Sequence, residues 1–191
     1  MAANSIADRP TSSFIAHIVS YRPADTEVVE RTTMIDSALP NPTLTFAFEA
    51  RVDVGPAVAV GGSGVDALRF IPITGGTVAG PRLNGTILPG GGDWATTRSD
   101  VVSELEARYL IEADDGAVID IVNRGFHRAD SPEQKAALRR GESIPETEYY
   151  YRTSPMFRTE APQHRWLCHT VFVGMARSEN GQVCIRFFDL A

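Results

Sequence analysis

Residues 101–124, VVSELEARYLIEADDGAVIDIVNR, have the pattern of two β-strands joined by a turn at Asp115-Gly116. Apolar and polar side chains alternate on both sides of this dipeptide, as in strands with two unlike faces. If Asp115-Gly116 supplies the two central turn residues, Arg108 lies opposite Asn123. Glu106, Arg108 and Asn123 then share one face of the hairpin. A longer loop would shift the register by one residue and exchange the two faces.

Short runs rich in β-forming residues continue from residue 44 to the end of the chain, with Gly and Pro between them. The expected strands are 44–54, 67–73, 82–88, 94–98, 101–113, 117–124, 149–159, 165–177 and 182–190. This spacing is typical of an antiparallel sandwich or barrel, and the number of strands favours a closed sheet. A doubly wound nucleotide-binding fold is not supported, because strands and helices do not alternate along the chain.

One short helix is expected before the strand at 149–159. Ser131 can cap its first turn, Pro132 suits its first position, and Gln134 completes a capping box. Gly141 can end the helix. We expect this helix to lie across one end of the barrel.

The composition indicates one domain with an extension. The chain has 191 residues, 43% of them apolar, which is enough for a single core. Residues 1–43 are interrupted by prolines and are expected to form an N-terminal arm, while residues 44–191 form a single β-barrel domain. Cys168 and Cys184 are expected to be reduced thiols.

The charge and the hydropathy disfavour two kinds of partner. Eighteen Lys and Arg against 24 Asp and Glu give a formal charge of -6, the wrong sign for a general binder of nucleic acid. No apolar run has the length of a membrane span or the basic leader of a signal peptide. We therefore expect a cytoplasmic protein that binds neither membrane nor nucleic acid.

Five motifs in order resemble the domain-of-unknown-function 3237 family over about residues 44–191. They are 71–94 (IPITGGTVAGPRLNGTILPGGGDW), 106–109 (EARY), 123–125 (NRG), 148–157 (EYYYRTSPMF) and Trp166-Leu167 followed by 172–174 (FVG). The resemblance implies a mainly β fold, an antiparallel calycin-like barrel of about 8–10 strands, often oligomeric and without an obligatory cofactor. Cys168 stands where the family usually has Asn, and the arm is longer than usual. The family supplies no reaction, because most members are uncharacterised.

Three residues are candidates for proton transfer. Asp93 follows three glycines, which allow a sharp turn of the backbone towards the barrel mouth, where burial raises a carboxyl pKa. Strand alternation pairs Tyr150 with Arg152 on the face that we expect to point inward. His127 is placed to sit at the barrel rim and titrates near neutrality. The alternatives for the first two are a turn aspartate and a packed tyrosine.

Arg108, Arg124 and Arg152 are candidates for holding an anionic oxygen of a ligand, because a guanidinium offers a fixed fork of donors. Structural ion pairs with acids such as Glu106 explain the same arginines equally well. The remaining expected pocket residues are Trp94, Glu106, Asn123, Phe157, Trp166 and Cys168. No metal site is expected, because His164 and His169 point to opposite faces of a strand.

These residues predict a cofactor-independent enzyme that binds a small apolar or aromatic oxygenated molecule inside the barrel. Acid/base groups would promote dehydration, isomerisation, lyase chemistry or ring closure. The alternatives are a non-catalytic small-molecule binding barrel and an assembly module built on the arm, and a homo-oligomer is expected. All of these enzyme hypotheses require acidic and cationic side chains that project into a hollow interior.

Overall fold

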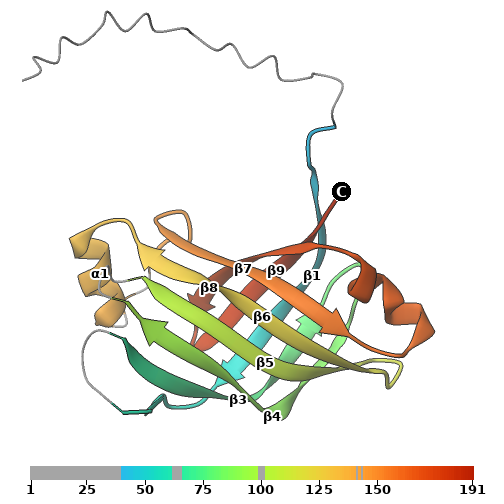
Figure 1. The fold of residues 1–191 in the computed structure, drawn as a ribbon, viewed down its shortest axis with the longest axis horizontal. Helices are drawn as coiled ribbons and strands as arrows, with labels where there is room; N and C mark the ends of the chain where they lie inside the picture. Colours follow the sequence, from blue (N-terminus) through green and yellow to red (C-terminus); the bar gives the residue numbers. More distant parts are fainter. Residues whose placement is uncertain (1–39, 62–65, 99–101, 141, 143) are drawn as a thin grey trace, which may run out of the picture. The chain divides into compact units, whose positions relative to one another are not determined.

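A single antiparallel sheet curls round on itself in the part of the chain that follows residue 40 (Figure 1). The computed structural model describes residues 40–61, 66–98, 102–140, 142 and 144–191. The strands are β1 (Leu44–Val54), β2 (Val58–Ala59), β3 (Ala67–Ala79), β4 (Gly85–Thr97), β5 (Ser103–Ala113), β6 (Val118–Ala129), β7 (Tyr149–Arg158), β8 (Phe172–Glu179) and β9 (Gln182–Leu190). Helix α1 (Pro132–Arg139) and 3-10 helix η1 (Pro162–His169) complete the structure.

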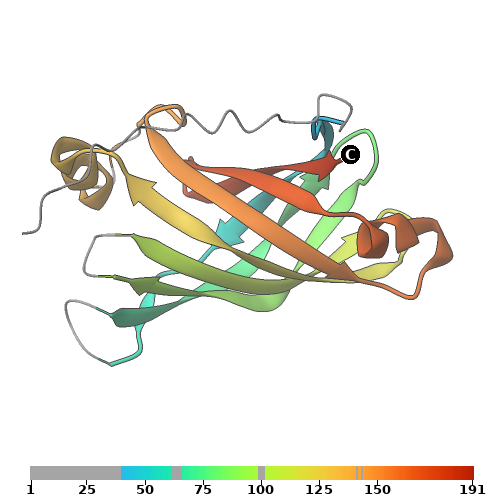
Figure 2. The same cartoon turned by 45° about the horizontal axis from the view of Figure 1, so that its top comes forward.

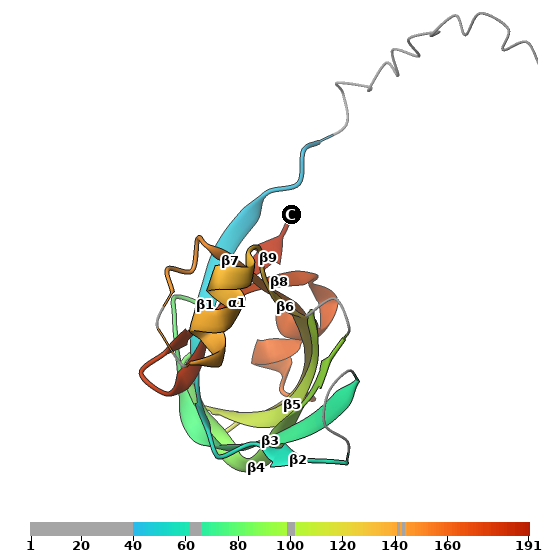
Figure 3. The same ribbon diagram turned by 90° about the vertical axis from the view of Figure 1, so that its left-hand side faces the viewer.

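The sheet closes because β1 pairs with strands from both ends of the chain. The order is β1-β9-β8-β7-β6-β5-β4-β3, and β1 also pairs with β3, with Val52 opposite Gly76. Short β2 extends the outer edge of β3. Figure 3 looks into this closed barrel. The predicted mainly β, antiparallel barrel is confirmed, and the expected bounds 44–54 and 182–190 are those of β1 and β9.

The two ends of the barrel sheet meet. The Thr43 amide donates to the Ala191 carbonyl at 2.8 Å, and the Ala191 amide donates back to Thr43 at 3.0 Å. Leu190 also donates to the Val171 carbonyl at 2.9 Å, just after η1. The first and last residues of the barrel are therefore neighbours at the end where η1 lies.

The helix follows its predicted capping pattern. The Gln134 amide donates to Ser131 Oγ at 3.2 Å, and the Ser131 amide donates to Gln134 Oε1 at 2.9 Å. This reciprocal pair is the expected capping box. Figure 2 shows α1 and η1 at opposite ends of the barrel. In the described part of the chain no helix is long and apolar enough to cross a membrane.

Several predicted strand boundaries are wrong: β3 and β6 run on to Ala79 and Ala129, beyond the expected ends at 73 and 124. The expected strands 82–88 and 94–98 are one strand, β4, because the glycines between them form a bulge instead of a break. The expected strand 165–177 is η1 followed by β8. Leu167 in η1 is buried and packs against the core, so this apolar run covers one end of the barrel instead of lining its wall.

The predicted register of the β5–β6 hairpin is wrong by one residue. The Ala113 amide donates to the Ala117 carbonyl at 2.9 Å, which leaves three loop residues, and the last of them, Gly116, has a φ of 82°. This is the three-residue hairpin loop that needs glycine in the left-handed region. Ala107 therefore lies opposite Asn123, and Arg108 lies opposite Val122.

The half of the barrel next to η1 is filled by aromatic side chains. The ring centroids of Phe48 and Phe187 are 5.0 Å apart, and those of Phe157 and Phe172 are 5.2 Å apart. Phe48, Phe172 and Phe187 have at most 1% of their surface exposed. This half of the barrel is an apolar core, so the predicted hollow must lie in the other half.

The structure does not test the prediction of an N-terminal arm before the barrel. Positions 1–39 of the expected arm (1–43) lie outside the described residues. The arm and the homo-oligomer stay predictions.

A bulge in β4 gives the first test of this fold. A Cβ added at Gly91 would lie 2.5 Å from the Arg108 carbonyl oxygen and 2.6 Å from Tyr109 Cβ. Gly91→Ala should therefore lower the free energy of unfolding by about 1–3 kcal/mol, measured by urea denaturation. Gly55→Ala is the matched control, because its nearest contacts are at 3.6 Å, and it should change stability by less than about 1 kcal/mol. Equal losses in the two variants would contradict this account of the bulge.

Candidate functional site

Polar side chains gather inside the half of the barrel that the aromatic rings leave free. Asp93, Tyr109, Asn123, Tyr151 and Thr153 line a cavity of about 30 Å³. They come from four consecutive strands, β4 to β7. The other lining residues are apolar: Val52, Val54, Ile73, Leu105, Ala107, Val183 and Ile185. The space holds about two water molecules, so a ring-sized ligand must displace side chains as it enters.

The bulge in β4 determines how Asp93 and Tyr109 meet. Leu88 pairs with Leu110 and Gly92 pairs with Arg108, so three residues of β4, 89–91, span the single residue Tyr109. Gly90 has a φ of 108°, which favours glycine. After the bulge Asp93 lies opposite Ala107 on the inward face. The glycines thus leave room for the tyrosine and return the strand to register with the acid inside.

Asp93 is held in a weakly polar environment. Its Oδ1 is out of contact with solvent and has no hydrogen-bond partner among the described residues. Burial raises the pKa of Asp93 from its ordinary 3.8 to about 6, although the Glu106 backbone amide and the positive charge of Arg69 oppose the rise. Both protonation states of this carboxyl are therefore accessible near neutral pH.

Two tyrosines stand beside this acid in their neutral form. Burial raises the pKa of Tyr109 and of Tyr151, and the negative charge of Asp93 raises both further. The Tyr109 hydroxyl, Asn123 Oδ1 and Thr153 Oγ1 are buried without a hydrogen-bond partner in the described part of the chain. Unsatisfied polar atoms are uncommon in protein interiors, and four of them, counting Asp93 Oδ1, border one cavity here.

His127 lies next to the cavity wall. It pairs with Tyr151 across β6 and β7, and the two ring centroids are 5.0 Å apart. A second tyrosine, Tyr149, is 5.5 Å away. Burial lowers the pKa of His127, as does the charge of Arg69, so the imidazole is neutral at pH 7. His127 is close to the polar side chains without lining the cavity, and its role stays a prediction.

The expectation that arginines of β5 and β6 point inward is wrong. Arg108 donates two hydrogen bonds of 3.0 Å to Asp120 on the outer surface, and Arg124 pairs with Glu106 at 2.8 Å. More than half of each arginine side chain is exposed. In the observed register Arg124 lies opposite Glu106 and Arg108 opposite Val122, so both arginines share the outer face, because the alternate positions hold the buried Tyr109 and Ile121. Both arginines form structural ion pairs, as the alternative interpretation proposes. Glu106, the partner of Arg124, therefore also lies outside the pocket.

Tyr150 and Arg152 also lie on the outside of the barrel. The guanidinium of Arg152 is 5.4 Å from the Tyr150 ring centroid, Arg128 is 4.5 Å from the same ring, and Arg152 donates to the Tyr151 carbonyl at 2.9 Å. Their inward neighbours in β7 are Tyr149 and Tyr151, which are buried. The predicted pairing of Tyr150 with Arg152 is confirmed, but the predicted face is wrong.

Four other expected pocket residues, Trp94, Phe157, Trp166 and Cys168, also lie outside the cavity. Trp94 is 45% exposed on the outer face, where it packs on Phe70 with ring centroids 4.9 Å apart. Phe157 belongs to the filled half of the barrel. Trp166 and Cys168 lie in η1, and Cys168 is exposed. Trp94 is outside because it follows the inward Asp93 in a strand, so the two adjacent side chains diverge.

Tyr109, Tyr151 and Thr153 are the site residues that the sequence reasoning missed. The inward residues of β7 are Tyr149, Tyr151, Thr153, Pro155 and Phe157, whereas the other face carries the charged Arg152 and Arg158 and the polar Ser154. This difference in polarity was the signal that identifies the buried face. The predicted placement of Arg152 in the interior conflicts with this signal.

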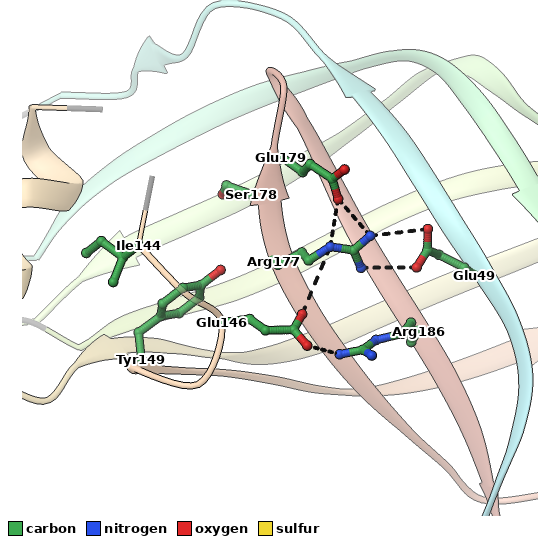
Figure 4. A pocket seen from close by; sticks show the side chains of 8 residues that line it. All are labelled: Glu49, Ile144, Glu146, Tyr149, Arg177, Ser178, Glu179 and Arg186. Carbon is green, nitrogen blue, oxygen red and sulfur yellow. Dashed lines mark hydrogen bonds and ion pairs between the residues drawn. The ribbon is translucent and has the colours of Figure 1, made fainter. Parts of the chain in front are cut away.

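A second hollow of about 340 Å³ lies on the outer side of β1, β8 and β9 (Figure 4). Arg177 bridges Glu49 at 3.0 Å and Glu179 at 2.7 Å, and Arg186 pairs with Glu146. The positive charges of this hollow are already matched by carboxylates. We therefore assign it a structural role, in which Glu146 ties the segment before β7 to Arg177 of β8 and Arg186 of β9.

The fold and the interior define a class of protein: a closed β-barrel with a polar cavity at one end. The chain belongs to the family described as "Protein of unknown function (DUF3237)", whose sequence profile matches residues 42–190, and the resemblance is confirmed. It is 38% identical over 146 residues to "UPF0311 protein RPA1785" of Rhodopseudomonas palustris, covering 75% of this chain and 95% of that protein. The crystal structure of RPA1785 superimposes with a TM-score of 0.75 at 34% identity, covering 80% of this chain and 100% of that one.

One relative carries a name that states a reaction. The chain is 36% identical over 87 residues to "Hydroalkoxylation enzyme phnH" of Penicillium herquei, which is 46% of this chain and 58% of that protein. This match links the barrel family to an enzyme.

The elevated pKa of Asp93 predicts a pH-dependent stability difference. Because the folded-state pKa lies above the unfolded one, folding takes up a proton between pH 4 and 6, and the stability from the neutral carboxyl is lost as pH rises through 6. Asp93→Asn should therefore gain up to about 3 kcal/mol relative to wild type between pH 4 and 7, measured by urea denaturation. Other titrating groups, such as His127, contribute equally to the pH dependence of both proteins, so their contributions cancel in the difference. A stability difference between Asp93→Asn and wild type that does not change with pH would refute the buried acid.

Proposed function

We propose that the chain is a cofactor-independent enzyme that moves a proton on a small apolar or aromatic oxygenated molecule bound in the barrel. The observation that carries this proposal is Asp93: a carboxyl with a pKa of about 6, whose unpartnered Oδ1 borders the cavity. A catalytic acid or base works best when its pKa is close to the working pH. Within the predicted reaction classes we favour ring closure or isomerisation.

The name of the fungal relative supports intramolecular hydroalkoxylation as the specific reaction. The Asp93 carboxyl gives its proton to one alkene carbon, and the substrate's own hydroxyl oxygen bonds to the other. The C=C π bond and the O–H bond break, while one C–H and one C–O bond form. The hydroxyl proton then returns to the Asp93 carboxylate, so the acid is regenerated and no oxidant or reductant is consumed.

The surroundings of Asp93 support this chemistry in two ways. Tyr109 and Asn123 can hold a substrate oxygen next to the acid, which fixes the attacking geometry. The apolar wall that includes Val52 and Ile185, and the small free volume of about 30 Å³, leave little room for bulk water to add in place of the substrate's hydroxyl. The geometry therefore favours ring closure over hydration.

The test measures turnover of alkenyl phenols such as ortho-prenylphenol to their cyclic ethers by chromatography and mass spectrometry. Asp93→Asn should reduce kcat by about 100-fold or more. Because the acid form gives the proton, kcat of the wild type should fall as pH rises past 6.

Glu106→Gln is the control, because Glu106 is a half-exposed acid on the outer face of the neighbouring strand. It should keep full turnover. Unchanged turnover in Asp93→Asn would remove this acid from the mechanism. Saturable binding of the substrates without any conversion by the wild type would favour the alternative, a non-catalytic binding barrel.

The size of the cavity gives a separate prediction. Leu105 lines it and is only partly buried, so truncation of this side chain widens the cavity without opening the filled core. Leu105→Ala should increase the affinity for bulkier alkenyl phenols several-fold relative to ortho-prenylphenol. Ile119→Ala, a truncation of a fully buried residue that does not line the cavity, should lower stability without this shift in preference. An unchanged preference in Leu105→Ala would contradict a substrate site at this position.

A further inference from the structure

The two walls of the cavity differ in chemistry. Strands β4 to β7 supply the polar side chains Asp93, Tyr109, Asn123, Tyr151 and Thr153. Strands β1, β3 and β9 supply only the apolar side chains of Val52, Val54, Ile73, Val183 and Ile185. A molecule between these walls meets hydrogen-bonding groups along one edge and hydrocarbon along the other.

The polar wall offers both donors and acceptors that no described residue satisfies. The Tyr109 and Thr153 hydroxyls can donate, Asn123 Oδ1 can accept, and these residues are 2%, 8% and 3% exposed. Leaving such a group unpaired in the interior is unfavourable by about 1–3 kcal/mol. A ligand that carries both an acceptor and a hydroxyl donor on one edge relieves this penalty.

Two glycines make room for the Thr153 side chain. A Cβ at Gly174 would lie 2.1 Å from Thr153 Oγ1, and a Cβ at Gly125 would lie 2.7 Å from its methyl carbon. Both neighbouring strands therefore leave out a side chain where Thr153 stands. The hydroxyl of this residue, which has no partner among the described residues, borders the cavity.

The charges on the wall select against anions. Asp93 is the one carboxylate among the described lining residues, and those residues include no lysine or arginine. Arg69 does not line the cavity, but it lies opposite the buried Ala95 on the face of the sheet that Asp93 shares, and its charge lowers the pKa of Asp93. A bound carboxylate would face the charge of Asp93, and no guanidinium is among the described residues that line the cavity.

We infer that the cavity takes a neutral ligand that is oxygenated along one edge only, with its donor and acceptor oxygens towards β4–β7 and its hydrocarbon edge towards β9, β1 and β3. This inference rests on the site of the proposed function and names the substrate class of that site. It differs from the earlier expectation of a carboxylate or other anion held by inward arginines.

The test is a comparison of simple probes by isothermal titration calorimetry, in wild type and in the widened Leu105→Ala background. Catechol carries two hydroxyls on one edge of the ring, whereas its isomer hydroquinone carries them on opposite edges, and benzoate carries a negative charge. Catechol should bind about tenfold or more tightly than hydroquinone or benzoate. Equal affinities, tighter binding of benzoate, or no catechol binding in either background would overturn the inference.

Isosteric variants test the individual wall groups. Thr153→Val and Tyr109→Phe should each weaken catechol binding about tenfold, the value of one lost hydrogen bond, and leave binding of oxygen-free toluene unchanged. Tyr150→Phe is the control on the outer face and should bind catechol like wild type. Unchanged catechol binding in both Thr153→Val and Tyr109→Phe would contradict the polar edge.

These binding results do not depend on turnover. Edge-selective binding without conversion of any alkenyl phenol would keep this inference and defeat the proposed function. Conversion that depends on Asp93, together with equal binding of catechol and hydroquinone, would support the proposed function and overturn this inference.

Discussion

Every side chain of a closed antiparallel sheet must face either the interior or the exterior, and a single extra residue in a turn or bulge decides which. In this barrel two local features make that decision for the cavity. The three-residue loop that ends at Gly116 turns Asn123 inward and Arg108 outward. The glycine bulge at 89–91 accommodates Tyr109 and returns Asp93 to the inward face. The polar wall exists because both features are present.

The same alternation separates the charges of the molecule. The outer face pairs its arginines with carboxylates, as Arg108 does with Asp120 and Arg124 with Glu106. The inner face keeps one acid, Asp93, away from these guanidinium groups. An acid with few compensating charges retains its proton to a higher pH, and this gives the interior a group able to donate and accept protons near neutrality.

Features that depend on residues close together in the chain could be predicted from the sequence. Features that depend on the register between paired strands could not. The capping box of Ser131 and Gln134 and the bounds of β1 and β9 depend on local patterns, and the structure agrees with them. Asp93 was placed correctly because glycines precede it. The side chain of Trp94, the next residue, points to the opposite face because side chains alternate along a strand. The face on which Tyr150 lies depends on the register of β7, which is determined by pairing with β6 and β8. The expected strand 165–177 includes residues 165–169, which belong to η1, because an apolar run follows them in β8.

The adjacency of Thr43 and Ala191 affects how the protein can be handled. The strands that begin and end the barrel, β1 and β9, reach the cavity at their opposite ends, through Val52 and Val183. A tag or surface tether at Ala191 would therefore leave the cavity end unobstructed. A short linker between Thr43 and Ala191 would also make the barrel circular, so that new termini could be cut at the β5–β6 loop while every strand keeps its neighbours.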